Sequence, residues 1–232
     1  SLGGRGGDAA REHLIGALAD SQRRPWAALG LGMLAHEHAD ADVATALLAA
    51  LAKEPSAETR TALWLALGLT RDPRATSVLI DALQRAAEPR ARMYAAQALA
   101  IHGSDEGRRA LSARLDTERS PLARSQIALA LGVLGAREDL DAIVAALDSV
   151  SEPVLQSQVA TAIAFHGSGE AVTKLASLVA SEKLDVAARA AAIEGLGMML
   201  SRAPALSLGR TSRSANFTLF PEWLVAACGT TF

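Results

Sequence analysis

One sequence pattern recurs six times along the chain, and no other feature constrains the possible fold as strongly. Its first position is Arg in five copies and Gln in one, at Arg24, Arg60, Arg92, Arg124, Gln156 and Arg189. Most copies follow one another at intervals of 32 residues. A period in this range is typical of repeat proteins, in which each copy buries its apolar face only against its neighbours.

A second helical pattern alternates with the first and keeps the same period. Its aliphatic residues lie four positions apart, on one helix face, at Leu47/Leu51, Leu79/Leu83, Leu111/Leu115, Ile143/Leu147 and Leu175/Val179. Segments such as Asp72-Pro73 and Glu88-Pro89 separate the two patterns, as expected of loops that start helices. Aromatic residues make up only 3% of the chain, which suits closely stacked helices better than a β-rich fold. We therefore predict an all-α solenoid with one helix pair for each of the six copies.

The eighth residue after the Arg position is always small. It is Ala in two copies and Gly in the other four, at Gly32, Gly68, Gly132 and Gly197. Gly inside a helix costs about 1 kcal/mol relative to Ala, so its repetition needs a packing reason. We expect another helix to cross at this position too closely for a side chain.

Acidic residues precede the Arg position by four or six residues in five copies. They are Glu54, Glu88, Glu118, Glu152 and Asp185. This spacing predicts a ladder of ion pairs between the Arg side chains and the loop carboxylates. We interpret the ladder as structural, and exposed pairs of this kind contribute little stability.

The segment Arg92–Ala100, Arg-Met-Tyr-Ala-Ala-Gln-Ala-Leu-Ala, follows the general pattern Arg-x-x-Ala-Ala-x-Ala-Leu-Gly together with its five counterparts. This pattern resembles the HEAT-like repeats of the phycobilisome-lyase type, a branch of the HEAT and armadillo solenoids. The resemblance covers about residues 8–202 and is specific for architecture, because that family serves many unrelated roles. It implies a right-handed superhelix, an α-solenoid whose Arg-bearing helices line the concave side.

The two ends of the chain depart from the repeat. Residues 1–7 are rich in Gly and read as a flexible leader, and the first residue is Ser rather than Met, so a longer natural N-terminus or a removed export signal stays open. The solenoid is predicted over residues 8–202. Residues 203–232 form an aromatic-rich tail, with Phe217, Phe220, Trp223 and Phe232. We favour a tail that caps the last helix pair over one that docks in a groove or mediates self-association.

Composition excludes several classes of partner. The net charge is −2 and no segment is polybasic, which argues against nucleic-acid binding. The single cysteine, Cys228, excludes an internal disulfide and a cysteine cluster for zinc. The densest apolar run, around Ala41–Ala52, is too short to span a membrane. We therefore predict no nucleic-acid partner, no membrane insertion and no cofactor.

A partner-binding surface is expected where the Arg-bearing helices line the concave side. Residues one, two and five positions after the Arg would form a stripe in each repeat. The candidate residues are Trp26, Leu29, Leu65, Met93, Tyr94, Gln97, Gln126, Leu129, Gln158, Thr161 and Glu194. This surface is neutral and partly apolar, so it suits an apolar peptide or helix better than a phosphate backbone. The alternative is that these positions are ordinary surface or core.

The leading functional hypothesis is a non-enzymatic scaffold that binds a protein or peptide in this groove. The alternative, which follows from the family resemblance, is a lyase-like or chaperone-like subunit that acts on a tetrapyrrole or a modified protein. Within one repeat we assign Leu131 to the stack, and Ser125, Gln126 and Leu129 to the groove. Leu131→Asp should therefore unfold the array, whereas Leu129→Asp should leave the fold intact.

The histidines offer two further readings. His36-Glu37-His38, in a lengthened first repeat, could hold a metal ion. Dimetal hydroxylases built on HEAT-like repeats resemble this fold, but they use several His-Glu pairs on facing helices, and this chain has one such pair. We favour a solvated loop in which Asp40 or Asp42 caps the next helix, with no metal. His102-Gly103-Ser104 and His166-Gly167-Ser168 predict helix ends, with Gly as the left-handed stop and Ser as the next cap.

Overall fold

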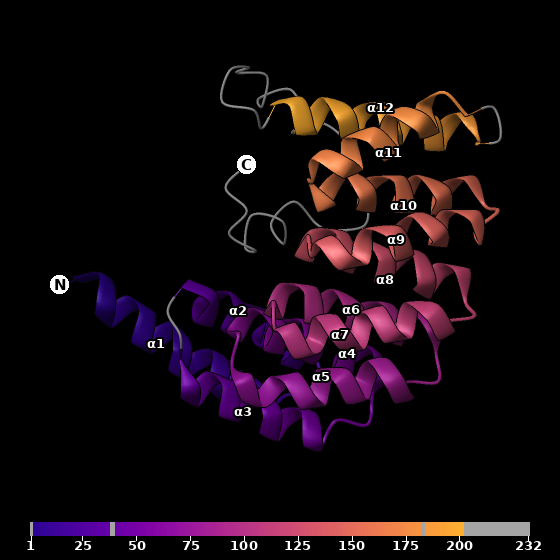
Figure 1. The fold of residues 1–232 in the computed structure, drawn as a ribbon. Coiled ribbons are helices and arrows are strands. Elements are labelled where there is room, and N and C mark those ends of the chain that lie inside the picture. The colour runs from indigo at the N-terminus through magenta and orange to yellow at the C-terminus, as the bar shows by residue number, and fades with distance from the viewer. Residues whose placement is uncertain (1, 38–39, 182–183, 202–232) are drawn as a thin grey trace. The chain divides into compact units, whose positions relative to one another are not determined.

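The computed structural model describes residues 2–37, 40–181 and 184–201 (Figure 1). Over these residues the chain forms α-helices, one short 3₁₀ turn and no β-strand, which confirms the predicted all-α solenoid. The helices are α1 (Leu2–Ala17), α2 (Arg24–Glu37), α3 (Ala41–Ala52), α4 (Ala57–Thr70), α5 (Pro73–Arg85), α6 (Pro89–His102), α7 (Asp105–Thr117), α8 (Pro121–Leu134), α9 (Leu140–Asp148), α10 (Pro153–His166), α11 (Gly169–Val179) and α12 (Val186–Ser201). The predicted tail, residues 203–232, lies outside the described residues.

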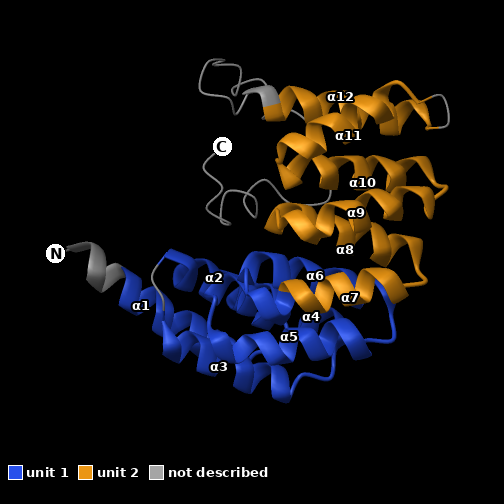
Figure 2. Ribbon diagram, viewed as in Figure 1, with its two compact units in different colours: residues 1–107 blue, residues 108–232 orange. Residues whose placement is uncertain are grey.

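The helices group into two compact units, residues 1–107 (unit 1) and residues 108–232 (unit 2) (Figure 2). In unit 1 the Arg-bearing helices pack in series, α2 on α4 and α4 on α6, while α3 and α5 lie against them from one side. Unit 2 repeats this scheme: α8 packs on α10 and α10 on α12, with α9 and α11 alongside. Each unit therefore consists of two helix layers, and its core lies between them.

The repeated Gly marks close helix crossings, as predicted, in three of its four positions. A Cβ atom added to Gly32 would lie 2.8 Å from Ala66 Cα, and one added to Gly68 would lie 2.5 Å from the Ala98 carbonyl oxygen. At Gly132 the corresponding distance to the Ala162 carbonyl oxygen is 2.2 Å. Real Cβ contacts do not reach these distances, so a side chain is excluded and the helix backbones touch.

The prediction is wrong for Gly197, where an added Cβ atom would meet nothing within 4 Å. The close approach in α12 occurs instead at Gly195, whose added Cβ atom would lie 2.6 Å from Ala164 Cβ. The last interval between copies is 33 residues rather than 32. One extra residue turns a helix by about 100°, so the same repeat position no longer faces the neighbouring helix.

The Arg position has a recurring structural role. The side chain donates a hydrogen bond to the carbonyl oxygen six residues earlier, from Arg24 Nε to Leu18 at 2.6 Å and from an Arg92 guanidinium nitrogen to Ala86 at 2.8 Å. Gln156 makes the same bond to Val150, at 2.9 Å. Carbonyl groups at helix ends need such donors, so a neutral amide can replace the guanidinium.

The predicted ion-pair ladder is present only in part. Arg24 pairs with Glu54, whose side chain is buried and also accepts a hydrogen bond from the Ser56 N–H group. Glu118 instead pairs with Arg114 on its own helix, at 2.9 Å. The sequence spacing identified the carboxylates, but the shorter reach to a local donor decides the partner at Glu118.

Local helix-end predictions agree with the structure. Gly103 and Gly167 end α6 and α10 with φ angles of 76° and 72°, in the left-handed region that favours Gly. Ser104 Oγ accepts a hydrogen bond from the Gly107 N–H group, and Ser168 Oγ accepts one from Ala171. These motifs depend only on neighbouring residues, which is why the sequence specifies them.

The predicted flexible leader is not observed, because α1 begins at Leu2 rather than at Asp8. Once a helix is nucleated, each added residue gains one backbone hydrogen bond, and this can carry a helix into a Gly-rich segment. Among the described residues, no helix is both long enough and apolar enough to cross a membrane.

Candidate functional site

Most of the predicted groove residues are buried, and the prediction that they form a binding surface is wrong. The buried residues are Leu65, Gln97, Gln126, Leu129, Gln158 and Thr161. They lie in the middle turns of α4, α6, α8 and α10, which pack against helices of their own unit. The run Leu63–Leu69 in α4 contains no charged residue and signals this all-round burial, because a helix apolar on all faces belongs to a core.

The middle repeat shows the error most clearly. Gln126 is 0% exposed and Leu129 is 1% exposed. Gln158 Oε1 on α10 accepts a hydrogen bond from Gln126 Nε2 and another from Ser125 Oγ, both at 2.8 Å. These three side chains form a buried polar bridge between α8 and α10. The expectation that Leu129→Asp would leave the fold intact is therefore wrong.

The exposed candidates gather at α2. Trp26 is 75% exposed and Met33 is 49% exposed, and Leu29 between them is partly buried. Their spacing of three and four residues places them on one side of the helix. We call Trp26, Leu29 and Met33 the α2 stripe. On α6 of the same unit, Met93 and Tyr94 are partly exposed, and on α12 of unit 2 Glu194 is exposed.

Two buried histidines connect consecutive repeats. His102 Nε2 lies 3.0 Å from the Asp72 carbonyl oxygen, and His166 Nε2 lies 2.9 Å from the Ala136 carbonyl oxygen. A carbonyl oxygen only accepts, so Nε2 carries the proton in both rings. His166 Nδ1 also lies 3.0 Å from Ser168 Oγ. These histidines therefore satisfy loop backbone groups of the preceding repeat, which is a structural role.

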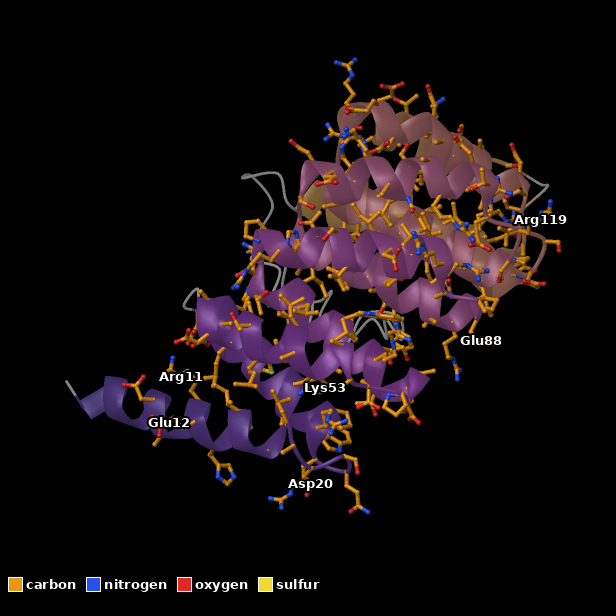
Figure 3. The ribbon with its side chains drawn as sticks, turned by 90° about the horizontal axis from the view of Figure 1, so that it is seen from below. Arg11, Glu12, Asp20, Lys53, Glu88 and Arg119 are labelled. Atoms are coloured by element: carbon orange, nitrogen blue, oxygen red, sulfur yellow. The ribbon has the colours of Figure 1, made fainter. Side chains whose placement is uncertain are left out.

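The lengthened first repeat is organised by Asp40. Its carboxylate accepts hydrogen bonds from the Asp42 and Val43 N–H groups, which confirms it as the cap of α3, and it pairs with Arg11 at 3.0 Å. Arg11 lies on the side of α1 that faces the neighbouring helices, while Glu12 lies on the outer side (Figure 3). Burial raises the pKa of Asp40, but the Arg11 and backbone hydrogen bonds outweigh it and hold this pKa below its ordinary value.

The metal reading of this loop depends on its histidines. His36 Nδ1 lies 3.3 Å from the Leu69 carbonyl oxygen, and His38 lies outside the described residues. Among the residues that the structure describes, no group of three or more His, Cys, Asp or Glu side chains is arranged to hold a metal ion. The described partners of His36 and Asp40 are thus groups of the fold itself.

Comparison with known proteins gives three findings. The structure of human deoxyhypusine hydroxylase in complex with glycerol aligns with 98% of this chain and 96% of its own, at 20% sequence identity and a TM-score of 0.40. No curated protein matches the sequence. Residues 12–100 and 43–132 both match a family model described as HEAT repeats, and together they span more than half of the chain.

Proposed function

The chain belongs to the HEAT-repeat family, and from this premise we propose that it is a non-enzymatic scaffold that binds a protein partner through the α2 stripe. Stacked helical repeats commonly present extended surfaces for protein–protein interaction. The observation that carries the proposal is the exposure of Trp26, which leaves 75% of a large apolar side chain in solvent. Trp is enriched among the residues that dominate binding energy at protein interfaces.

The chemistry of the stripe indicates the kind of partner. Trp26, Leu29 and Met33 offer a rigid aromatic ring, an aliphatic side chain and an adaptable thioether along about two helix turns. None of the three carries a charge, and the adjacent Arg24 is already paired with Glu54. Such a surface suits the apolar face of an amphipathic helix, whose anchor residues recur at the same spacing.

The buried polar side chains support a non-enzymatic role. His102 and His166 bond to loop carbonyl groups, and Gln126 and Gln158 form the bridge between α8 and α10. Catalytic groups are expected in a cleft, beside the position of a substrate. The described contacts of these side chains are instead contacts of helix with helix or of helix with loop.

Site-specific photocrosslinking tests the proposal. A photoreactive p-benzoylphenylalanine at position 26 should form covalent adducts with a partner in an extract of the source cells. The same group in place of Ser77, an exposed residue on α5 of the same unit, serves as the matched control. The adducts at position 26 should be lost when Met33→Asp places a charge in the stripe, since the apolar contact would then desolvate a carboxylate.

Circular dichroism of these variants shows whether the fold is retained. Because Trp26 and Met33 are exposed, their substitution should change the helical signal and the melting temperature little. Identical adduct patterns at positions 26 and 77, or adducts that persist with Met33→Asp, would show that the stripe is ordinary surface.

A further inference from the structure

Unit 1 contains a small open pocket between α3, α4 and α5. Its volume is about 330 Å³, at the lower end of the range for ligand sites. Its apolar wall includes Leu48 and Leu51 of α3, Trp64 of α4 and Val78 of α5. Leu48 and Val78 are only partly buried, so the pocket exposes apolar carbon to solvent. None of the α2 stripe residues lines it.

Charged groups stand on one side of this pocket. The Arg60 guanidinium lies over the Trp64 ring, 5.5 Å from its centroid, in a cation–π arrangement. Glu54 also lines the pocket, but its carboxylate is paired with Arg24. The Arg24 hydrogen bond, with the Ser56 N–H group and the nearby Arg60 charge, lowers the pKa of Glu54 against the effect of burial. This carboxylate is therefore ionised and matched at neutral pH.

The charges around the pocket sum to one positive charge. Asp81, the second acidic residue of the lining, pairs with Arg85 at 2.7 Å. Arg24 balances Glu54, which leaves the exposed Arg60 without an ion-pair partner within the described residues. A guanidinium held over an aromatic ring keeps its outer N–H groups available for a carboxylate. The pocket thus combines an apolar interior with one available cation at its edge.

We propose that this pocket binds the C-terminal residue of a partner polypeptide, with its apolar side chain inside and its carboxylate on Arg60. A C-terminal residue carries an apolar side chain and a carboxylate on the same Cα atom, so one residue can satisfy both features. An internal Asp or Glu would place its charge where the pocket is apolar. The volume accommodates one aliphatic side chain, and we take Leu as the probe.

Isothermal titration calorimetry with the complete chain tests this assignment. The probe is acetyl-Gly-Ser-Leu, compared as the free acid and as the C-terminal amide. The acid should bind at least ten times more tightly than the amide, because the amide loses the charge-assisted hydrogen bonds to Arg60. Equal affinities would overturn the carboxylate assignment. Acetyl-leucine alone should bind more weakly than the tripeptide, and equal binding would identify a free carboxylate rather than a polypeptide as the ligand.

Two substitutions locate the binding site. Arg60→Gln should abolish the preference for the acid, while Arg90→Gln, which changes an exposed Arg on α6 of the same unit, should preserve it. Val78→Asp should weaken the acid at least tenfold through charge repulsion in the pocket. Both residues are at least partly exposed, so the fold should persist. Acid binding that survives Arg60→Gln or Val78→Asp would place the peptide elsewhere.

This inference does not depend on the α2 stripe. Trp26→Ala should leave the affinity for the acid unchanged, and Arg60→Gln should leave the adducts at position 26 unchanged. Loss of acid binding in Trp26→Ala would contradict a separate pocket, because none of the stripe residues lines it.

Discussion

Trp26 on α2 and Gln126 on α8 occupy the same position of the repeat, two residues after the Arg, yet they have opposite surroundings. Trp26 is 75% exposed, whereas Gln126 is fully buried. The neighbouring helix explains the difference. Next to Gln126, α10 offers Gln158, whose amide oxygen accepts a hydrogen bond. Next to Trp26, the corresponding residue of α4 is Ala62, whose methyl group is too short to cover an indole ring.

The same contrast appears between α8 and α12. Gly132 touches the backbone of α10, whereas Gly197 has nothing within 4 Å of its added Cβ atom. A repeat position therefore does not carry a fixed environment. It fixes where a side chain points along its own helix, and the partner helix decides whether that side chain is core, bridge or surface. The helices near the ends of the chain, α2 and α12, are where the pattern and the environment diverge.

The largest effect is expected from a charge at matched Leu positions. Leu129→Asp should lower the free energy of unfolding by about 3–5 kcal/mol, because the carboxylate would be buried without a partner. Leu29→Asp, at the same repeat position in α2, should cost about 1 kcal/mol, because Leu29 is only partly buried. Urea denaturation followed by circular dichroism measures both. Equal losses would show that the two positions have the same environment.

The matched Gly positions should respond with opposite signs. Gly132→Ala should destabilise the protein by about 1–3 kcal/mol, since the new methyl group would collide with the Ala162 carbonyl oxygen. Gly197→Ala should stabilise it by about 0.5–1 kcal/mol, because Ala is the better helix former and space is available. Thermal melts of the two variants against the parent test this. A gain in stability at Gly132 would contradict the backbone contact.

A smaller effect is expected at the buried bridge. Gln158→Leu removes the acceptor of Gln126 and should cost about 1–3 kcal/mol. The double variant Gln126→Leu with Gln158→Leu should recover most of that loss, because Ser125 Oγ retains the Leu122 carbonyl oxygen as acceptor. A double-mutant cycle from denaturation curves gives the coupling energy. Simple additivity of the two changes would mean that the bridge contributes nothing.

The fold follows from the sequence because its signals are local or periodic. Gly103, Gly167 and Ser168 form helix ends that depend on a few adjacent residues, and the structure places them as predicted. The close crossings at Gly68 and Gly132 follow from a small residue repeated where a helix disfavours it. The last repeat fails because an interval of one extra residue rotates α12, and Gly195 takes the place of Gly197.

The candidate site follows from the sequence only in part. Trp26 was predicted as a surface anchor and is exposed, but Leu129 and Gln158 were assigned to the same surface and are buried. Periodicity gives the direction of a side chain on its helix and contains no information on how closely the next helix covers it. The pocket beside Arg60 could not be predicted, because its wall comes from three helices that meet only in the folded chain.

The contact of Gly132 with the Ala162 carbonyl group has a consequence for how the repeats diverge in sequence. The two helices are held apart by main-chain atoms, so main-chain size, rather than the side chains around it, sets their separation at that point. Side chains elsewhere in the interface can change in size and alter only how well the remaining space is filled. The contact acts as a fixed pivot, about which substitutions tilt one helix against the other without changing their distance at the crossing.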